Sequence, residues 1–199
     1  MKWWDIRNFK SPSRDFLVSV DNIKDGEGVN CLSYDPTIPS KFLIGTAQGS
    51  VFSCRMQPKV GSESLFLTTF KDCYHSKVMS VDRNPLHPKS FLTVGGNTVK
   101  IWCEDINSSA IMWMKPQTSR FTFGAWSPTR MSLFFTTNTE GTFDIWDFLF
   151  RQDAPILSFR LADCPIQNMT VNYSSVFEAY VTNPSYIADS SGSRTSGIG

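Results

Sequence analysis

The chain repeats one pattern of residues at intervals of 43 to 49 positions. Three segments, which begin at Val29, Val78 and Phe121, each hold an apolar run, a polar residue followed by proline, a second apolar run, a tight turn and a third apolar run. Two independent landmarks share this period, which identifies a true internal repeat. The landmarks are the prolines Pro36, Pro85 and Pro128 and the residues that end the third runs, Cys54, Trp102 and Trp146.

Each repeat has the features of short β-strands. Apolar and polar residues alternate at 98–102 and 142–146, as the side chains of a half-buried strand must. A fourth candidate strand follows each third run, at 16–20, 65–70, 110–114 and 155–161. Four strands in a repeat of forty-odd residues predict an all-β fold, in which each repeat forms one four-stranded blade of a β-propeller.

Glycine and tryptophan have packing roles in this interpretation. Gly49 and Gly141 provide the permissive backbone of the turn between the second and third strands. Trp102 and Trp146 are expected to fill the space between neighbouring blades. These residues therefore predict a structure and not a chemical activity.

The end of the third repeat resembles a WD repeat. Its sequence TEGTFDIWD finishes on Trp146-Asp147, the dipeptide that gives these repeats their name. His75 stands 27 residues before Trp102, where WD repeats have a histidine that hydrogen-bonds inward toward the tryptophan. We therefore expect His75 to be structural, in a network that is degraded at the turn position usually filled by aspartate. That position holds Gln48, Gly96 and Glu140 in the three repeats.

A closer resemblance covers residues 1–170. The runs NPLHPKSFLTVGGNTVKIWCED, SSAIMWMK, GAWSPTR and SLFFTTNTEGTFDIWDFLFRQDAPILSFRLADCP, with KWWDIR and KFLIGTAQGSVFSC before them, resemble the propeller of axonemal dynein intermediate chains, outer-arm chains in particular. The resemblance implies a non-catalytic scaffold in the axoneme of a cilium or flagellum. Its partners would be dynein heavy chains, a second intermediate chain and light chains, with microtubule association through the complex.

The propeller is expected to span residues 1–182 and to hold about four blades. Trp4-Asp5 lies 50 residues before Cys54, which predicts that the chain opens within a repeat, at its third strand. Residues 183–199 are Ser/Gly-rich and are expected to form a flexible tail. The family's light-chain-binding segment and opening blades would then be missing, and an unclosed propeller exposes strand edges. We therefore expect the isolated chain to be marginally stable.

Composition argues against several other functions. The net charge is +1, from 19 basic and 18 acidic residues, so no strong field favours nucleic acid or an anionic membrane. No apolar run approaches the roughly 20 residues that cross a bilayer. The aromatic residues follow strand alternation, which favours core packing over a base-stacking platform for single-stranded nucleic acid. Four basic residues near the expected blade edges and loops are expected to form a solvated rim, with a heavy-chain contact as the alternative; they are Lys71, Lys77, Arg83 and Lys89.

No residue pattern predicts catalysis, a cofactor, a metal or a small-molecule substrate. Cys73 and His75 are two positions apart but lack a third orienting group. Two histidines, His75 and His87, and no C-x-x-C pair cannot readily form a zinc site. No phosphate-binding G-x-x-x-x-G-K-[ST] loop occurs. The five cysteines are expected to be reduced and mostly buried; they are Cys31, Cys54, Cys73, Cys103 and Cys164.

A general WD-repeat adaptor is the alternative to the axonemal scaffold. Such an adaptor could be a cytoplasmic dynein intermediate chain or the substrate receptor of a ubiquitin ligase. A fold alone does not choose between these functions, because one fold supports many. Expression confined to ciliated cells or the male germ line would favour the axoneme.

Overall fold

The fold is all-β, as the repeat predicts. The computed structural model describes residues 1–7, 10–15, 18, 26–56, 66–70, 73–172 and 179–182. These residues form three four-stranded antiparallel sheets between two two-stranded ones. Blade 1 is β1 (Lys2–Trp3) and β2 (Arg14–Asp15), and blade 2 is β3 (Val29–Tyr34), β4 (Lys41–Thr46), β5 (Val51–Arg55) and β6 (Phe66–Phe70). Blade 3 is β7 (Val78–Arg83), β8 (Ser90–Gly95), β9 (Thr98–Cys103) and β10 (Met112–Trp113). Blade 4 is β11 (Phe121–Trp126), β12 (Leu133–Asn138), β13 (Thr142–Asp147) and β14 (Leu157–Arg160), and blade 5 is β15 (Asn168–Val171) and β16 (Ala179–Thr182).

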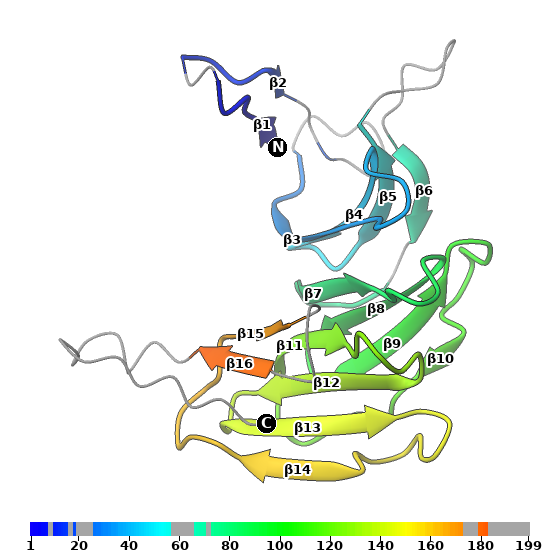
Figure 1. Ribbon diagram of the computed structural model, residues 1–199, viewed down its shortest axis with the longest axis vertical. Helices are drawn as coiled ribbons and strands as arrows, with labels where there is room; N and C mark the ends of the chain where they lie inside the picture. The colour runs from blue at the N-terminus through cyan, green and yellow to red at the C-terminus, as the bar shows by residue number, and fades with distance from the viewer. Residues whose placement is uncertain are drawn as a thin grey trace, which may run out of the picture.

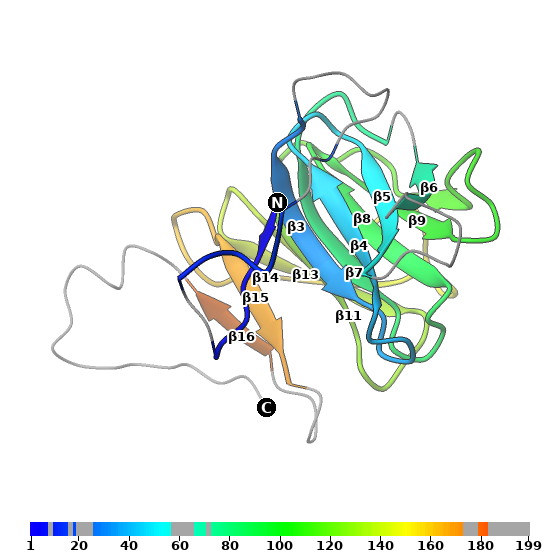
Figure 2. The same cartoon turned by 90° about the horizontal axis from the view of Figure 1, so that it is seen from above.

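The blades are stacked around an axis and do not form one continuous sheet. In Figure 1 they follow one another along an arc, with β3, β7, β11 and β15 on its inner side and β6, β10 and β14 outside. Each inner strand contacts the inner strand of the next blade. Figure 2 shows the strands of blades 2, 3 and 4 running roughly along one direction through the stack. This is the architecture of part of a propeller.

The polar residue before each repeated proline caps a turn between the first and second strands. Asp35 Oδ1 accepts the backbone N–H groups of Thr37 at 2.8 Å and Ile38 at 3.1 Å. Asn84 Oδ1 and Ser127 Oγ accept the corresponding N–H groups in blades 3 and 4. A side chain that satisfies these donors fixes the turn locally. The dipeptides Asp35-Pro36, Asn84-Pro85 and Ser127-Pro128 therefore recur for a conformational reason.

The repeated tryptophans pack between the blades. Trp102 lies against Phe70 of blade 2, with ring centroids 5.6 Å apart, and Trp146 stacks on Phe134 at 5.9 Å. Both indoles are buried, and each donates its N–H at 2.9 Å to a threonine hydroxyl of the second strand, Thr93 or Thr136. A buried indole N–H needs such an acceptor.

The structure differs from the expectation for His75. This side chain is exposed, whereas its neighbour Tyr74 is buried. The Tyr74 hydroxyl lies 2.8 Å from the Thr93 carbonyl oxygen and 3.0 Å from its Oγ1, and the same Oγ1 accepts the N–H of Trp102. Tyr74 therefore takes the inward position expected for His75. Its buried ring brings the hydroxyl within hydrogen-bond distance of Thr93, whose Oγ1 also accepts the N–H of Trp102.

The two ends of the chain are only partly described. Trp4 directly follows β1, is 48% exposed, and precedes Asp5, which forms an ion pair with Arg7. The predicted fourth strands at 65–70, 110–114 and 155–161 correspond to β6, β10 and β14. The fourth strand expected at 16–20 and the tail expected at 183–199 lie outside the described residues.

Two turn glycines offer a matched test of the blade hairpins. Gly141 has φ +79°, and a Cβ there would lie 2.0 Å from the Ala162 carbonyl oxygen; Gly96 has φ +59°, and its nearest atom would be Ser76 Oγ at 3.4 Å. Gly96→Ala should cost about 1–2 kcal/mol through backbone conformation alone. Gly141→Ala should cost more, because a backbone carbonyl must also move. Urea unfolding of both variants measures the difference, and equal losses would contradict this account.

Candidate functional site

Polar side chains on the inner strands connect one blade to the next. Ser33 Oγ of blade 2 accepts the backbone N–H of Arg83 at 3.1 Å, and Asp82 Oδ2 of blade 3 accepts that of Trp126 at 2.8 Å. Ser33 and Asp82 hold equivalent positions in their repeats, each three residues before the repeated proline, Pro36 or Pro85. The same connection is therefore made twice along the stack.

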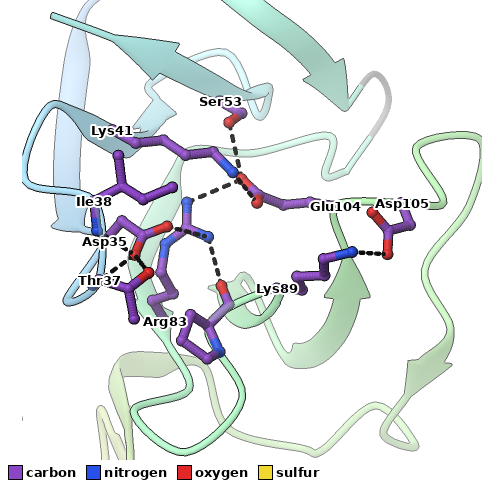
Figure 3. Close-up of polar contacts among 10 residues, drawn as sticks. Asp35, Thr37, Ile38, Lys41, Ser53, Arg83, Lys89, Glu104 and Asp105 are labelled. Atoms are coloured by element: carbon purple, nitrogen blue, oxygen red, sulfur yellow. Dashed lines mark hydrogen bonds and ion pairs between the residues drawn. The ribbon is translucent and has the colours of Figure 1, made fainter.

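An ionic cluster lies in the cleft between blades 2 and 3 (Figure 3). The Arg83 guanidinium lies 2.9 Å from Glu104 Oε1 and 3.6 Å from Asp35 Oδ2, and donates a hydrogen bond to the Pro88 carbonyl oxygen at 2.6 Å. Lys41 Nζ contacts the other carboxylate oxygen of Glu104. Ser53 Oγ donates to Glu104 Oε1 at 2.9 Å. Two positive and two negative side chains thus meet at the ends of strands from two blades.

Arg83 corrects one prediction from the sequence. The expectation that it belongs to a solvated rim is wrong, because its side chain is 1% exposed. Equivalent positions in blades 2 and 4 hold the aromatic residues Tyr34 and Trp126, so Arg83 occupies a packing position of the repeat. Lys89 fits the original expectation: its side chain is 61% exposed and pairs with Asp105. Lys77 is also exposed, and Lys71 lies outside the described residues.

The cluster keeps its carboxylates charged. Burial raises the pKa of Asp35, but hydrogen bonds from Thr37 and Ile38 and the charge of Arg83 outweigh it, so this pKa lies below its ordinary value. Burial likewise raises the pKa of Glu104, and its bonds from Arg83, Lys41 and Ser53 more than reverse the effect. Charged hydrogen bonds that satisfy an anion favour its ionised form. The cluster is therefore an internally neutralised contact between blades.

Asp82 is the exception, since none of the described cations is paired with its carboxylate. Burial raises its pKa to about 6, and the N–H of Trp126 only partly offsets the shift. A carboxyl whose pKa is higher in the folded state binds more protons there between the ordinary value near 3.8 and about 6. Its contribution to stability is therefore largest in acid and falls as the pH rises through that window.

Asp82→Asn should consequently raise the melting temperature at pH 7 relative to the unmodified chain. Asparagine keeps an acceptor for the Trp126 N–H but has no charge to bury. The gain should shrink as the pH falls from 6 to 4, where Asp82 becomes protonated. Thermal unfolding of the two proteins across this range tests the sign, and a gain that is constant with pH would contradict it.

Two cavities are lined by described residues whose polar groups are largely paired with one another. The cleft itself has a volume of about 330 Å³, and its charged groups are paired with one another. A larger groove of about 710 Å³ runs beside β9 and β10, and Lys100 in its lining donates to the Cys73 carbonyl oxygen. The other described residues of this lining have hydroxyl, amide, aromatic or small apolar side chains, including Ala110 and the exposed Trp113.

Three of the thiols, Cys31, Cys54 and Cys73, lie in surroundings that do not activate them. Cys73 is buried and donates its S–H to the Phe70 carbonyl oxygen at 3.1 Å, whereas His75 is exposed. Burial raises the pKa of Cys31 and of Cys54 to about 12, which leaves both as unreactive thiols.

Among the residues that the structure describes, no three His, Cys, Asp or Glu side chains are grouped to hold a metal ion. The described part of the chain also contains no helix that could span a membrane.

Asp147 of the Trp-Asp dipeptide is a structural residue at the end of β13. It is 1% exposed, accepts the Leu149 N–H at 3.1 Å and pairs with Arg130 at 2.6 Å. The corresponding positions in blades 2 and 3 are Arg55 and Cys103, whereas blade 1 has Asp5, which pairs with Arg7. Sequence reasoning missed Asp82 and Glu104 and assigned Arg83 to a solvated rim. A charged residue within an otherwise apolar, alternating strand was the available signal for Asp82 and for the burial of Arg83.

The stacked sheets, their inter-blade tryptophans and the paired inner strands define a WD-repeat β-propeller protein. A family model described as the WD40 domain of dynein axonemal intermediate chain 3 matches residues 6–182. The chain therefore belongs to the family of axonemal dynein intermediate chains.

Curated relatives agree with this family. The chain is 41% identical over 172 residues to ciliary dynein intermediate chain 3 of Heliocidaris crassispina, which covers 85% of this chain and 28% of the relative. It is 41% identical over 164 residues to human dynein axonemal intermediate chain 2, covering 81% of this chain and 27% of the relative. The 70 kDa intermediate chain of the Chlamydomonas reinhardtii flagellar outer arm is 30% identical over 174 residues, or 86% and 30% of the two chains. The chain thus spans less than a third of the length of these relatives.

Proposed function

We propose that this chain is a non-catalytic scaffold subunit of an axonemal dynein, in the outer arm of a cilium or flagellum. The main support for this proposal is the match of residues 6–182 to the WD40 domain of an axonemal dynein intermediate chain. The names of the relatives, which are ciliary, axonemal and flagellar outer-arm chains, support the location.

In this role the chain binds other proteins and performs no reaction. It would contact dynein heavy-chain tails, a second intermediate chain and light chains, and reach microtubules through the complex. The packing supports such a role, because a stack of rigid blades with hydrogen-bonded inner strands presents fixed surfaces. The internally neutralised cluster around Arg83 and Glu104 holds blades 2 and 3 in one arrangement.

Affinity purification of the tagged endogenous protein from ciliated tissue tests this function. Axonemal dynein heavy chains should co-purify, together with a second intermediate chain. An eluate that contains ubiquitin-ligase subunits or only cytoplasmic dynein would instead support the general adaptor. Trp146→Ala, which should disrupt the propeller, provides a control for capture that does not depend on the fold.

A further inference from the structure

A second cleft between blades repeats the position of the ionic cluster. It lies between blades 3 and 4, and its lining shares equivalent positions of the repeat with the cleft between blades 2 and 3. Counted from the repeated prolines, Ser90 takes the place of Lys41. Counted from the residues that end the third runs, Ile101 takes the place of Ser53. The two clefts are therefore comparable sites with different side chains.

The blade 4 wall of the second cleft is aromatic where the first cleft is ionic. Trp126 and Phe148 hold the repeat positions of Arg83 and Glu104, and their rings meet edge-on with centroids 6.1 Å apart. They line an apolar pocket of about 290 Å³. A cavity lined by paired charges holds water readily, whereas contact between water and apolar walls is unfavourable. Covering this pocket therefore lowers the free energy of the chain.

Half-exposed apolar side chains lie at the opening of this pocket. Ile111 and Met131 belong to its lining and are 49% and 48% exposed. Leu86 is 53% exposed and precedes His87, another residue of the lining. The pocket lies between two blades that each have four strands, so loops and not an unpaired strand edge leave these side chains open. An apolar patch that continues into a concave pocket is typical of an interaction site.

The charges near the pocket are neutralised within the chain. Lys89 pairs with Asp105 at 2.8 Å, and Arg130 pairs with Asp147 at 2.6 Å. The Asn84 amide in the lining donates to a backbone carbonyl oxygen of blade 4 and accepts two backbone N–H groups. The side chain that complements this pocket is therefore uncharged and apolar.

A protein is the ligand that this surface fits. An anionic membrane is attracted by a surplus of basic residues, whereas the ion pairs near the pocket balance one another. A small metabolite is oriented by placed polar groups, but His87 and Ser90 in the lining bond to each other, with Nδ1 and Oγ 2.9 Å apart. Protein interfaces, by contrast, are anchored by single side chains that fill a pocket and are ringed by weaker contacts.

We propose that the pocket between blades 3 and 4 receives one uncharged apolar side chain of a partner protein, with Leu86, Ile111 and Met131 packed around this anchor. The affinity comes from the apolar surface that the anchor and these three residues remove from water. The role of the pocket is independent of the proposed function. The expectation that the partner is a dynein subunit rests on that function.

Co-purification with the whole 199-residue chain, tagged and expressed in ciliated cells, tests the proposal through Met131. Met131→Glu should lower the recovery of one identified protein at least about tenfold, the effect expected at a central anchor site. Met131→Leu keeps an apolar side chain of similar volume and should retain that protein. Asn84 bonds to the backbone of Met131, so neither change removes this contact between blades. Ile111→Glu repeats the test on the blade 3 side, and the melting temperature of each variant shows whether it is folded.

A photo-crosslinking residue in place of Leu86 identifies the occupant in a chain whose pocket lining is unchanged. The cross-linked product should contain the same protein that Met131→Glu loses, joined through an apolar segment. Equal recovery of every co-purified protein with folded Met131→Glu, or a cross-link to a second copy of the chain, would overturn the proposal. Binding to phosphatidylcholine–phosphatidylserine vesicles that Met131→Glu abolishes would overturn it as well, since the occupant would then be lipid.

The outcomes separate this inference from the proposed function. If the protein that is lost and cross-linked is not a dynein subunit, the pocket is supported and the proposed function fails. If dynein subunits are recovered equally with the unmodified chain and with Met131→Glu, the function is supported and the pocket fails.

Discussion

Arg83→Ala is expected to lower the free energy of unfolding by about 3–5 kcal/mol, the usual cost of removing one partner from a buried ion pair. The Arg83 side chain is 1% exposed and contacts Glu104 at 2.9 Å and Asp35 at 3.6 Å. Its removal takes away the cation shared by two carboxylates, Asp35 and Glu104, whose side chains are only 4% and 9% exposed. Urea unfolding followed by circular dichroism measures the loss. A chain of marginal stability would be largely unfolded without denaturant.

Two further variants show whether the loss comes from uncompensated charge. The double variant Arg83→Met, Glu104→Gln removes charge of both signs and should recover a large part of the stability, because apolar replacements of buried pairs are often well tolerated. Lys89→Ala removes a cation from an exposed pair with Asp105, in which both side chains are about 60% exposed. It should change stability by less than about 1 kcal/mol. Equal losses for Arg83→Ala and Lys89→Ala would contradict the role of burial.

Trp146→Ala is expected to cost about 3–5 kcal/mol, as large aromatic truncations in a core do. Trp146 is fully buried, stacks on Phe134 and contacts Phe121 edge-on at 6.4 Å. Its loss opens a cavity between blades 3 and 4 and leaves the Thr136 hydroxyl without the indole N–H. The denaturation midpoint should fall accordingly.

Trp113→Ala is the matched control for this truncation. Trp113 lies in β10 and is 65% exposed, so the same change of residue removes little buried surface. Its effect should stay within about 0.5 kcal/mol. If both tryptophans cost the same, the inter-blade packing of Trp146 would not be the source of its contribution.

Local chemistry explains why so much of the fold was predictable. The alternation at 98–102 and 142–146 depends only on which side of a strand is buried, and the structure has β9 and β13 there. The turns after Asp35, Asn84 and Ser127 are fixed by bonds to residues two or three positions away. Such short-range constraints leave a repeated pattern in the sequence. The candidate strands counted within one period then give the four strands of a blade.

The candidate site was less predictable because it joins residues that are distant in sequence. Tyr74 and His75 are adjacent, and the family pattern favoured His75, but only the packing of the loop before β7 decides which ring turns inward. Arg83 is 21 residues from Glu104 and 48 from Asp35, and no local rule pairs them. A charged residue in this stretch therefore looked like one of several solvated cations.

The sequence by itself determined the all-β class, the four-stranded repeat and the family, because periodic burial and turn chemistry are properties of neighbouring residues. The tertiary structure alone decided which charges are buried together and which apolar residues stay exposed. Whether Arg83 is solvated or neutralised, and whether Met131 lies in a core or at the opening of a pocket, depends on the blade that lies beside it. Burial and electrostatic energies arise from neighbours in space, and these are set by the stacking of whole blades.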